Sequence, residues 1–396
     1  MYLIRRHRSA VLIALLLAIL AVGCSEKDKN PVGFGLWDEE GLWQVHQLVS
    51  RDVTADSSFH VSRGSGIGPY LLVGSWEGQE ARSLLAFEEN LPDTLSIPLT
   101  AASLNLIAYS EVSDDSILIS AYPLETTWSD STATWQNPWT TDGGDIGTEP
   151  IAEGLFATVG GVEFEMEFNQ AGVALVQSWL DGDLNLGILL KAEGLEGDRV
   201  KYFYSEDTPY YPYLKMVFSS QDTSDTVAVD SKKDTFIAQP VSAPEDDLLL
   251  VSDGHITRTW LRFDLSAVPE SSFINLALLS LTVSEFKDPL DNMSIRAYPV
   301  SDLQTLRHES TAYANVNLFP EKEVAELNLT ALVQEWVTGR ENEGIILKPY
   351  LEYSSLSQAL FYSSPADSAR QPSLKIVYTA RPGDARVASQ KDLTAK

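Results

Sequence analysis

The chain has 396 residues, with 28 Lys and Arg against 56 Asp and Glu, and a formal net charge of −28 at pH 7. Nucleic-acid binding needs clustered Lys and Arg that neutralise phosphates. The sequence has no basic stripe, so nucleic acid is not expected as a partner. The same negative field would repel polyanionic glycans and anionic lipid headgroups unless a divalent cation bridged them. Keeping the protein soluble is the simplest role for this charge.

The chain begins with the three parts of a signal peptide. A basic segment around Arg5 precedes an unbroken apolar run over residues 10–22, and Gly23 and Cys24 follow. The run is shorter than the ~20 apolar residues that span a bilayer as a helix. We therefore expect residues 1–23 to be a cleaved signal peptide and the mature protein to be exported.

Cys24 is the only cysteine of the chain and ends the sequence Ala-Val-Gly-Cys. That sequence resembles the lipobox of bacterial lipoproteins, in which the cysteine is acylated and becomes the first mature residue. The resemblance implies a membrane-bound protein with lipidation at Cys24 and an anchor and tether over residues 24–51. An ordinary secretory signal is the alternative. Ser25 beside the cysteine favours the outer membrane or the cell surface.

One module occurs twice in the rest of the chain. The sequence ALVQSWLDGDLNLGILLK at residues 174–191 recurs as ALVQEWVTGRENEGIILK at residues 331–348. Matching segments flank both copies in the same order, among them RSLLAF and RTWLRF, SAYPL and RAYPV, and KYFYS and ALFYS. A period of this length predicts tandem domains rather than a solenoid. We expect modules over residues 52–219 and 228–379, and a polar, disordered tail over residues 380–396.

Short β-branched or alternating segments, separated by Asp, Ser, Gly and Pro clusters, predict strands throughout both modules. The exception is the repeated ALVQSWL and ALVQEWV, whose apolar residues have helical spacing. Gly182 and Gly339 follow these segments, where a left-handed residue commonly ends a helix. The expected fold class is all-β, with two tandem jelly-roll-like β-sandwich modules that each contain one short helix.

The ordered motifs of the first module resemble those of the DNRLRE-domain family. They are RSLLAF, then TTWSDSTATWQNPW at residues 126–139, then ALVQSWLDGDLNLGILLK, and finally YFYSED with PYLKMVF. The second module has SDLQTLRHESTAYANV at residues 301–316 instead of the Trp-rich loop. The resemblance implies carbohydrate-binding modules of jelly-roll type in an exported protein, with polysaccharide as the partner, and some family members bind acidic polysaccharides.

Tryptophan side chains are the first candidates for ligand binding, because indole faces stack on sugar rings while neighbouring polar groups bond the hydroxyls. Trp128 and Trp135 lie in the Trp-rich loop, where packing of the loop against the sandwich is the alternative to binding. Trp139 and Trp76 are less closely tied to the shared motif positions than Trp128 and Trp135, and we expect them to be exposed.

Tyr210, Tyr211 and Tyr213 form a second aromatic cluster near the last strand of the first module, and we expect one of them to face solvent. The recurring Trp179 and Trp336 lie in apolar helical stripes, which is typical of core residues.

Two charged positions also recur between the modules. Arg82 and Arg258 lie beside apolar strands, where an ion pair that fixes the strand is more common than ligand binding. Asp56 and Asp234 recur at the module starts and are candidate Ca²⁺ ligands, because this cation prefers hard oxygen donors. Simple solvation of the surface is the alternative role for both aspartates.

Catalysis has little support in the sequence. The histidines of the mature chain do not recur between the modules and lack metal-ligand spacing. There is no nucleophile elbow and no Gly-rich phosphate loop. We therefore expect a lipid-anchored, non-enzymatic protein of the cell envelope that binds polysaccharide or mediates adhesion. One alternative is a structural envelope lipoprotein that docks proteins without a glycan. Another is a polysaccharide lyase or hydrolase, which would need paired carboxylates with perturbed pKa in a cleft.

Overall fold

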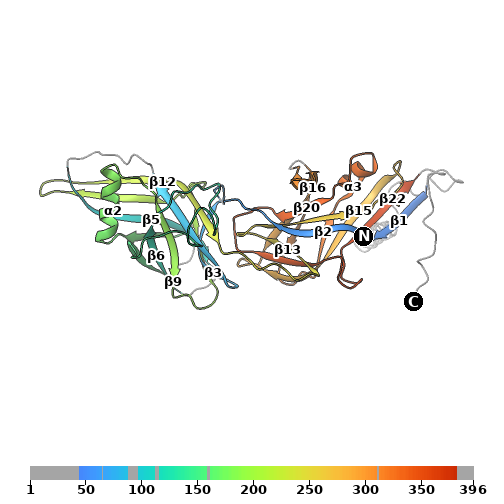
Figure 1. The fold of residues 1–396 in the computed structure, drawn as a ribbon, viewed down its shortest axis with the longest axis horizontal. Helices are drawn as coiled ribbons and strands as arrows, with labels where there is room; N and C mark the ends of the chain where they lie inside the picture. Colours follow the sequence, from blue (N-terminus) through green and yellow to red (C-terminus); the bar gives the residue numbers. More distant parts are fainter. Residues whose placement is uncertain are drawn as a thin grey trace, which may run out of the picture.

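The structure is a computed structural model that describes residues 44–64, 66–87, 97–111, 116–157, 161–309 and 312–380. The signal peptide, Cys24, most of the tether and nearly all of the tail lie outside the described residues. Antiparallel strands dominate the chain, so the predicted all-β sandwich fold is confirmed. Two lobes lie end to end along the long axis of the molecule (Figure 1).

The first lobe encloses one hydrophobic core between two layers of strands. Leu71, Leu104 and Phe203 are among the fully buried residues at its centre. The strands follow the order β12-β11-β5-β10-β3-β4-β9-β6-β7, with β8 beside β5. The elements are β3 (Tyr70–Trp76), β4 (Gln79–Phe87), β5 (Leu99–Glu111), β6 (Ile117–Pro123), β7 (Ala152–Phe156), β8 (Glu163–Glu167), α2 (Gln170–Leu180), β9 (Ile188–Glu193), β10 (Arg199–Tyr204), β11 (Tyr213–Ser219) and β12 (Ser224–Ala238).

The second lobe repeats this arrangement around its own core, which includes Leu261, Leu279 and Phe361. Its strands follow the order β1-β22-β15-β21-β13-β14-β20-β16-β17, and β2, β18 and β19 pair beside this path. The elements are β1 (Gln44–Ser50), β2 (Val53–His60), β13 (Leu248–Ser252), β14 (Thr257–Phe263), β15 (Phe273–Lys287), β16 (Met293–Asp302), β17 (Arg307–His308), β18 (Ala314–Leu318), β19 (Val324–Asn328), α3 (Thr330–Val337), β20 (Ile345–Pro349), β21 (Gln358–Tyr362) and β22 (Ser373–Ala380).

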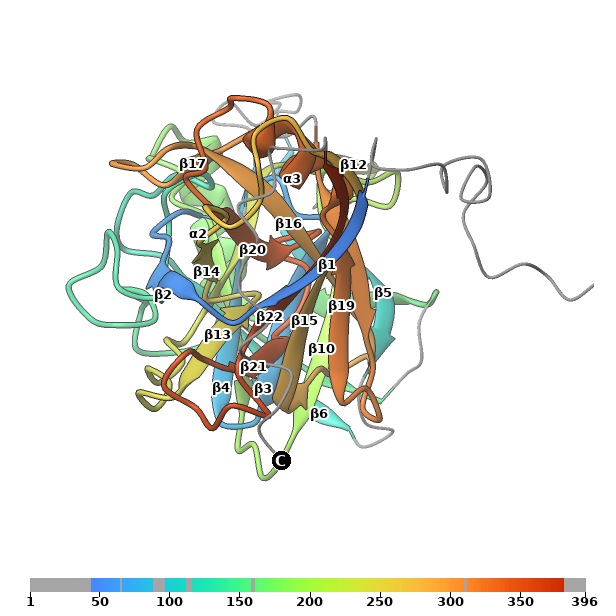
Figure 2. The same cartoon turned by 90° about the vertical axis from the view of Figure 1, so that its right-hand side faces the viewer.

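The two lobes exchange their first strands. β1 pairs with β22 and β2 pairs with β14, so the segment before and at the start of the first repeat completes the second lobe. The equivalent segment of the second repeat, β12, pairs along its first part with β11 and along its second part with β4. β12 therefore completes the first lobe. Figure 2 shows β1 running beside β22 in the lobe that faces the viewer.

This exchange changes the domain boundaries that the repeat predicted. The expected first module, residues 52–219, assigns β2 to the first lobe, although β2 pairs with β14 of the second lobe. The expected second module, residues 228–379, likewise includes most of β12, which lies in the first lobe. Sequence repeats and structural lobes are therefore offset by one strand. The physical reason is that β14 and β4 are equivalent pairing positions in the two lobes, and the strands that pair there, β2 and β12, are similar.

Within the described residues, each lobe contains one short helix, as predicted. In α2, the Asn169 side chain accepts a hydrogen bond from the Gly172 amide at 3.0 Å, which satisfies one of the free donors of the first turn. Gly182 and Gly339 follow the two helices with φ values of 105° and 114°, so the predicted left-handed positions are confirmed.

An apolar contact joins the lobes. The outer face of β3 and β10 alternates with the core face, and it presents Leu72 and Tyr202, which pack with Ile256 and Leu356 of the second lobe. The Tyr202 hydroxyl also lies 3.1 Å from the Ser355 hydroxyl. Residues of both lobes are buried in this contact. The contact therefore holds the surface residues around the junction in defined positions relative to one another.

Candidate functional site

Four tyrosines from the first lobe form a ring cluster beside the junction, and we call it the tyrosine cluster. Tyr70 and Tyr204 are directly opposed on β3 and β10. Tyr109 of β5 stacks on Tyr70 with ring centroids 4.3 Å apart, and Tyr210 lies 4.9 Å from Tyr204. Tyr204 shares a strand face with Tyr202, which the second lobe covers. The tyrosine cluster thus begins where the covered part of this face ends.

A pocket of about 280 Å³ separates the tyrosine cluster from the second lobe, and we call it the junction pocket. Tyr70 and Tyr109 line one side. Polar side chains from the segments around β16 and after β20, including Asn292, Ser294 and Ser354, line the other side. A ligand here would meet aromatic faces from one lobe and hydroxyl or amide groups from the other.

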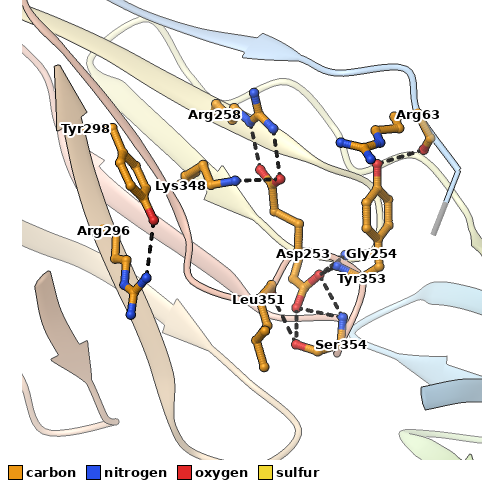
Figure 3. A network of polar contacts seen from close by, with 11 residues as sticks. Arg63, Asp253, Gly254, Arg258, Arg296, Tyr298, Lys348, Leu351, Tyr353 and Ser354 are labelled. Atoms are coloured by element: carbon orange, nitrogen blue, oxygen red, sulfur yellow. Dashed lines mark hydrogen bonds and ion pairs between the residues drawn. The ribbon is translucent and has the colours of Figure 1, made fainter. Parts of the chain in front are cut away.

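The second lobe continues the aromatic surface past the junction pocket. Tyr350 lines the pocket and is 47% exposed. The Arg296 guanidinium lies 3.6 Å from the Tyr350 ring centroid and 4.0 Å from that of Tyr313. We call these three residues the arginine sandwich. Figure 3 shows Arg296 beside Tyr298, whose hydroxyl accepts its hydrogen bond at 3.3 Å. Within the described part of the chain, no carboxylate pairs with Arg296.

A charged network holds the loop that forms the wall of the junction pocket. Arg258 donates two hydrogen bonds to Glu352, at 2.7 and 2.8 Å, and Lys348 donates a third at 2.9 Å (Figure 3). Burial alone would raise the pKa of Glu352, but the Arg258 hydrogen bonds and the two cations outweigh it and lower this pKa. The predicted strand-fixing ion pair of Arg258 is therefore present, and Arg82 makes the corresponding pair with Glu80 at 2.7 Å.

Asp253 is fully buried beneath the same loop. Its carboxylate accepts hydrogen bonds from the Gly254 amide at 2.7 Å, the Ser354 hydroxyl at 2.8 Å and the amides of Tyr353 and Ser354. Burial raises the pKa of Asp253 to about 7, although these donors oppose the rise. The carboxyl group therefore takes up a proton more readily in the folded protein than in the unfolded chain.

The raised pKa of Asp253 predicts a pH dependence of stability in the parent protein that Asp253→Asn should remove. Because the folded state binds the proton more tightly, the Asp253 contribution is largest below about pH 4 and falls until about pH 7, by on the order of 4 kcal/mol. Urea unfolding should therefore show that the variant loses less unfolding free energy than the parent as the pH rises from about 4 to about 7. Asp264→Asn, at an exposed carboxylate, is the control and should leave the slope nearly unchanged. Equal slopes for parent and Asp253→Asn would contradict the assignment.

The tryptophans predicted to bind ligand are placed differently from expectation. Trp128, Trp135 and Trp139 are each only 7% exposed and pack together in a small cluster under their loop. The Trp139 indole donates to the Thr134 carbonyl at 2.8 Å, and the Trp128 indole donates to the Leu186 carbonyl at 2.9 Å. The expected exposure of Trp139 was therefore wrong, because its indole serves the internal hydrogen bonding of the loop.

Cations cover two of these indoles. The Arg82 guanidinium lies 4.7 Å from the Trp135 ring centroid, and the Lys233 ammonium lies 4.2 Å from that of Trp128. This geometry fits the alternative in which the loop packs against the sandwich. Trp76 is half-buried and packs at the lobe junction.

The predicted tyrosines are exposed, with 52% exposure for Tyr210 and 41% for Tyr211. Tyr210 belongs to the tyrosine cluster, whereas Tyr211 makes no ring contact with the other described residues. Sequence reasoning did not find Tyr70, Tyr109 and the arginine sandwich. Tyr204 lies in the repeated Phe-Tyr-Ser motif, which was the available signal for it.

The two recurring aspartates have the same structural role in different lobes. Asp56 accepts hydrogen bonds from the Ser364 amide at 2.7 Å and the Ser364 hydroxyl at 3.1 Å. Asp234 accepts one from the Glu206 amide at 2.8 Å, at the matching position after the repeated Phe-Tyr-Ser. Among the described residues, no group of three or more His, Cys, Asp and Glu is arranged to hold a metal ion. Each aspartate thus fixes an exchanged strand to a turn.

None of the helices in the described ranges is long and apolar enough to cross a membrane. No family model matches the chain, and no curated protein matches it. The junction itself, with its aromatic surface and polar pocket, therefore provides the basis for a functional proposal.

Proposed function

We propose that the protein binds polysaccharide along the tyrosine cluster, the junction pocket and the arginine sandwich, which together we call the junction site. The observation that carries this proposal is that exposed tyrosines of both lobes border one polar pocket. Aromatic faces stack on the apolar faces of sugar rings, and the amide and hydroxyl groups of the pocket can bond sugar hydroxyls. The resemblance to carbohydrate-binding modules agrees with this function.

The arginine sandwich favours a ligand that carries anionic groups. Arg296 is always protonated, and the two tyrosine rings hold its guanidinium in one plane. A guanidinium without a carboxylate partner in the described protein can receive a carboxylate or sulfate of the ligand. The negative net charge opposes such a ligand at long range, but salt screens that field beyond about 10 Å.

Retention on polysaccharide columns tests the proposal. Tyr109→Ala and Tyr350→Ala should each weaken retention of the intact protein roughly 10-fold, the equivalent of about 1.4 kcal/mol for a lost ring contact. Phe273→Ala is the matched control, because Phe273 is 60% exposed at the start of β15, far from the junction. Neutral and acidic polymers should be compared with calcium and then with chelator. Arg296→Gln should weaken retention on acidic polymers only.

The outcomes separate the binding role from its alternatives. An absence of retention by the parent protein on every polymer would contradict glycan binding and favour a structural envelope role with protein docking. Equal losses for Tyr109→Ala and Phe273→Ala would show that the effect does not arise at the junction site.

The enzyme alternative has one observation in its favour. Asp253 and Asp288 both line the junction pocket, and burial raises the pKa of each. Their oxygens are occupied, however, since Asp288 accepts from the Ser357 hydroxyl at 2.6 Å and the Leu290 amide at 2.6 Å. Because these carboxylates already accept hydrogen bonds from the turns around the pocket, their arrangement favours a structural role in a binding site over proton transfer to a substrate. Release of reducing or unsaturated ends from any polymer of the panel would favour a lyase or hydrolase instead.

The proposed cellular setting follows from the sequence. An exported, lipid-anchored protein of this kind would present the junction site at the cell envelope, with Cys24 as the acylated residue. Metabolic labelling with a fatty acid tests this proposal, because Cys24→Ser should abolish the label.

A further inference from the structure

The second lobe contains another cavity, of about 530 Å³, at the end away from the junction. Its walls are the end of β14, the segment that follows β14 and the last turn of α3. The other end of β14 adjoins Ile256, which belongs to the junction contact. A seven-residue strand covers about 20 Å, so this cavity is separate from the junction site. We call it the α3 pocket.

Trp336 distinguishes the α3 pocket from the equivalent place in the first lobe. Trp179, its counterpart in the repeat, is 4% exposed and belongs to the core of the first lobe. Trp336 is half-buried, packs against the core from outside and lines the α3 pocket. The same motif position therefore serves the core in one lobe and presents part of an indole to a cavity in the other.

Two charged side chains, Arg262 and Glu270, border the α3 pocket, and neither makes an ion pair within the described part of the chain. The nearby Asp264 accepts hydrogen bonds from the amide and hydroxyl of Ser266 at 2.8 and 2.9 Å. These hydrogen bonds, and then the charge of Arg262, lower the pKa of Asp264. Arg262 can donate to ligand oxygens and Glu270 can accept from ligand hydroxyls. An indole with one donor and one acceptor group nearby suits a ring that has an apolar face and a polar edge.

We propose that the α3 pocket binds a short saccharide, separately from the polymer at the junction site. The sugar ring would stack on Trp336, with its hydroxyls bonded by Arg262 and Glu270. The cavity volume lies within the ~300–1,000 Å³ of small-molecule sites. The α3 pocket has one indole, which suits a single sugar ring or one end of a chain, whereas the junction site has exposed aromatic rings on both sides of its pocket, which suit a longer chain.

Titration of the intact protein with cellotriose and with trigalacturonate tests this site, followed by calorimetry and tryptophan fluorescence. At least one of the two trisaccharides should bind saturably. Trp336→Ala should weaken that binding roughly 10-fold or more, because it removes the stacking face. Tyr109→Ala should leave it unchanged while it still lowers retention on polymers.

A second pair of variants separates loss of binding from loss of stability, because Trp336→Ala also removes packing against the core. Glu270→Ala and Arg262→Gln change side chains that border the pocket outside the core, and each should weaken the trisaccharide several-fold at an unchanged unfolding midpoint. Absence of saturable binding of both trisaccharides would overturn the proposal, and so would unchanged affinity in all three variants. Loss of trisaccharide binding in Tyr109→Ala would assign the sugar to the junction site instead.

Discussion

A chain that begins at residue 61 is expected to keep a folded first lobe and to lose the folded second lobe. β1 and β2 supply a seven-residue and an eight-residue strand to the second lobe, and Leu48 and Val53 pack against its core. Each net hydrogen bond contributes about 0.5–1.5 kcal/mol, and a domain has only ~5–15 kcal/mol of net stability. Loss of both strands therefore removes about as much free energy as the lobe has available.

Calorimetry and limited proteolysis of residues 61–380 would measure this effect. The first lobe should unfold in its own transition, because β12 remains attached to it in residues 61–238. The second lobe should be cleaved rapidly, since β22 and β14 would expose unpaired edges.

Addition of a peptide of residues 44–60 should restore protection to the second lobe. A matched control is removal of residues 381–396, which should leave both transitions in place. If the chain of residues 61–380 unfolded in the same way as the intact protein, the exchanged strands would not be needed for the second lobe.

The repeat predicted the architecture of each lobe but could not predict the exchange. Asp56 and Asp234 were recognised as equivalent positions, and both do fix a strand to the turn after Phe-Tyr-Ser. The same equivalence makes the two strand slots alike, so the sequence alone does not indicate which strand enters which lobe. In the structure, the segment between β2 and β3 connects the lobes, and the Gly64 and Gly66 amides donate to the Ser131 and Asp130 carbonyls at 3.0 and 3.2 Å.

The candidate site was only partly predictable, for a topological reason. Tyr70, Tyr109 and Tyr204 are far apart in the sequence and meet because β3, β10 and β5 are neighbours in the sheet. The densest aromatic sequence, in contrast, forms the interior of a loop. Indole donors that lie close to free loop carbonyls are satisfied within the loop, as Trp139 is by Thr134. Local density of aromatic residues therefore predicted packing better than ligand contact.

Arg258→Ala is expected to cost about 3–5 kcal/mol of unfolding free energy, because it leaves the carboxylate of Glu352 buried without its main partner. The side chains of Arg258 and Glu352 are only 12% and 8% exposed. The repeat offers a matched control at Arg82, whose partner Glu80 is 28% exposed. Arg82→Ala should cost less, about 1–2 kcal/mol, because water can solvate the carboxylate that remains.

The double variant Arg258→Met with Glu352→Gln separates the charge effect from packing. It removes both members of the buried pair, so it should recover much of the stability that Arg258→Ala loses. Lys348 then remains without its carboxylate partner, and its pKa, which burial already lowers, should fall further because Glu352 no longer raises it. Urea unfolding of the four proteins, with retention on polysaccharide measured in parallel, would test this account. If Arg258→Ala and Arg82→Ala were equally destabilising, burial of the second-lobe pair would not govern its strength. Since Glu352 lies between Leu351 and Ser354 of the pocket wall, Arg258→Ala should also weaken retention, and the double variant should restore part of it.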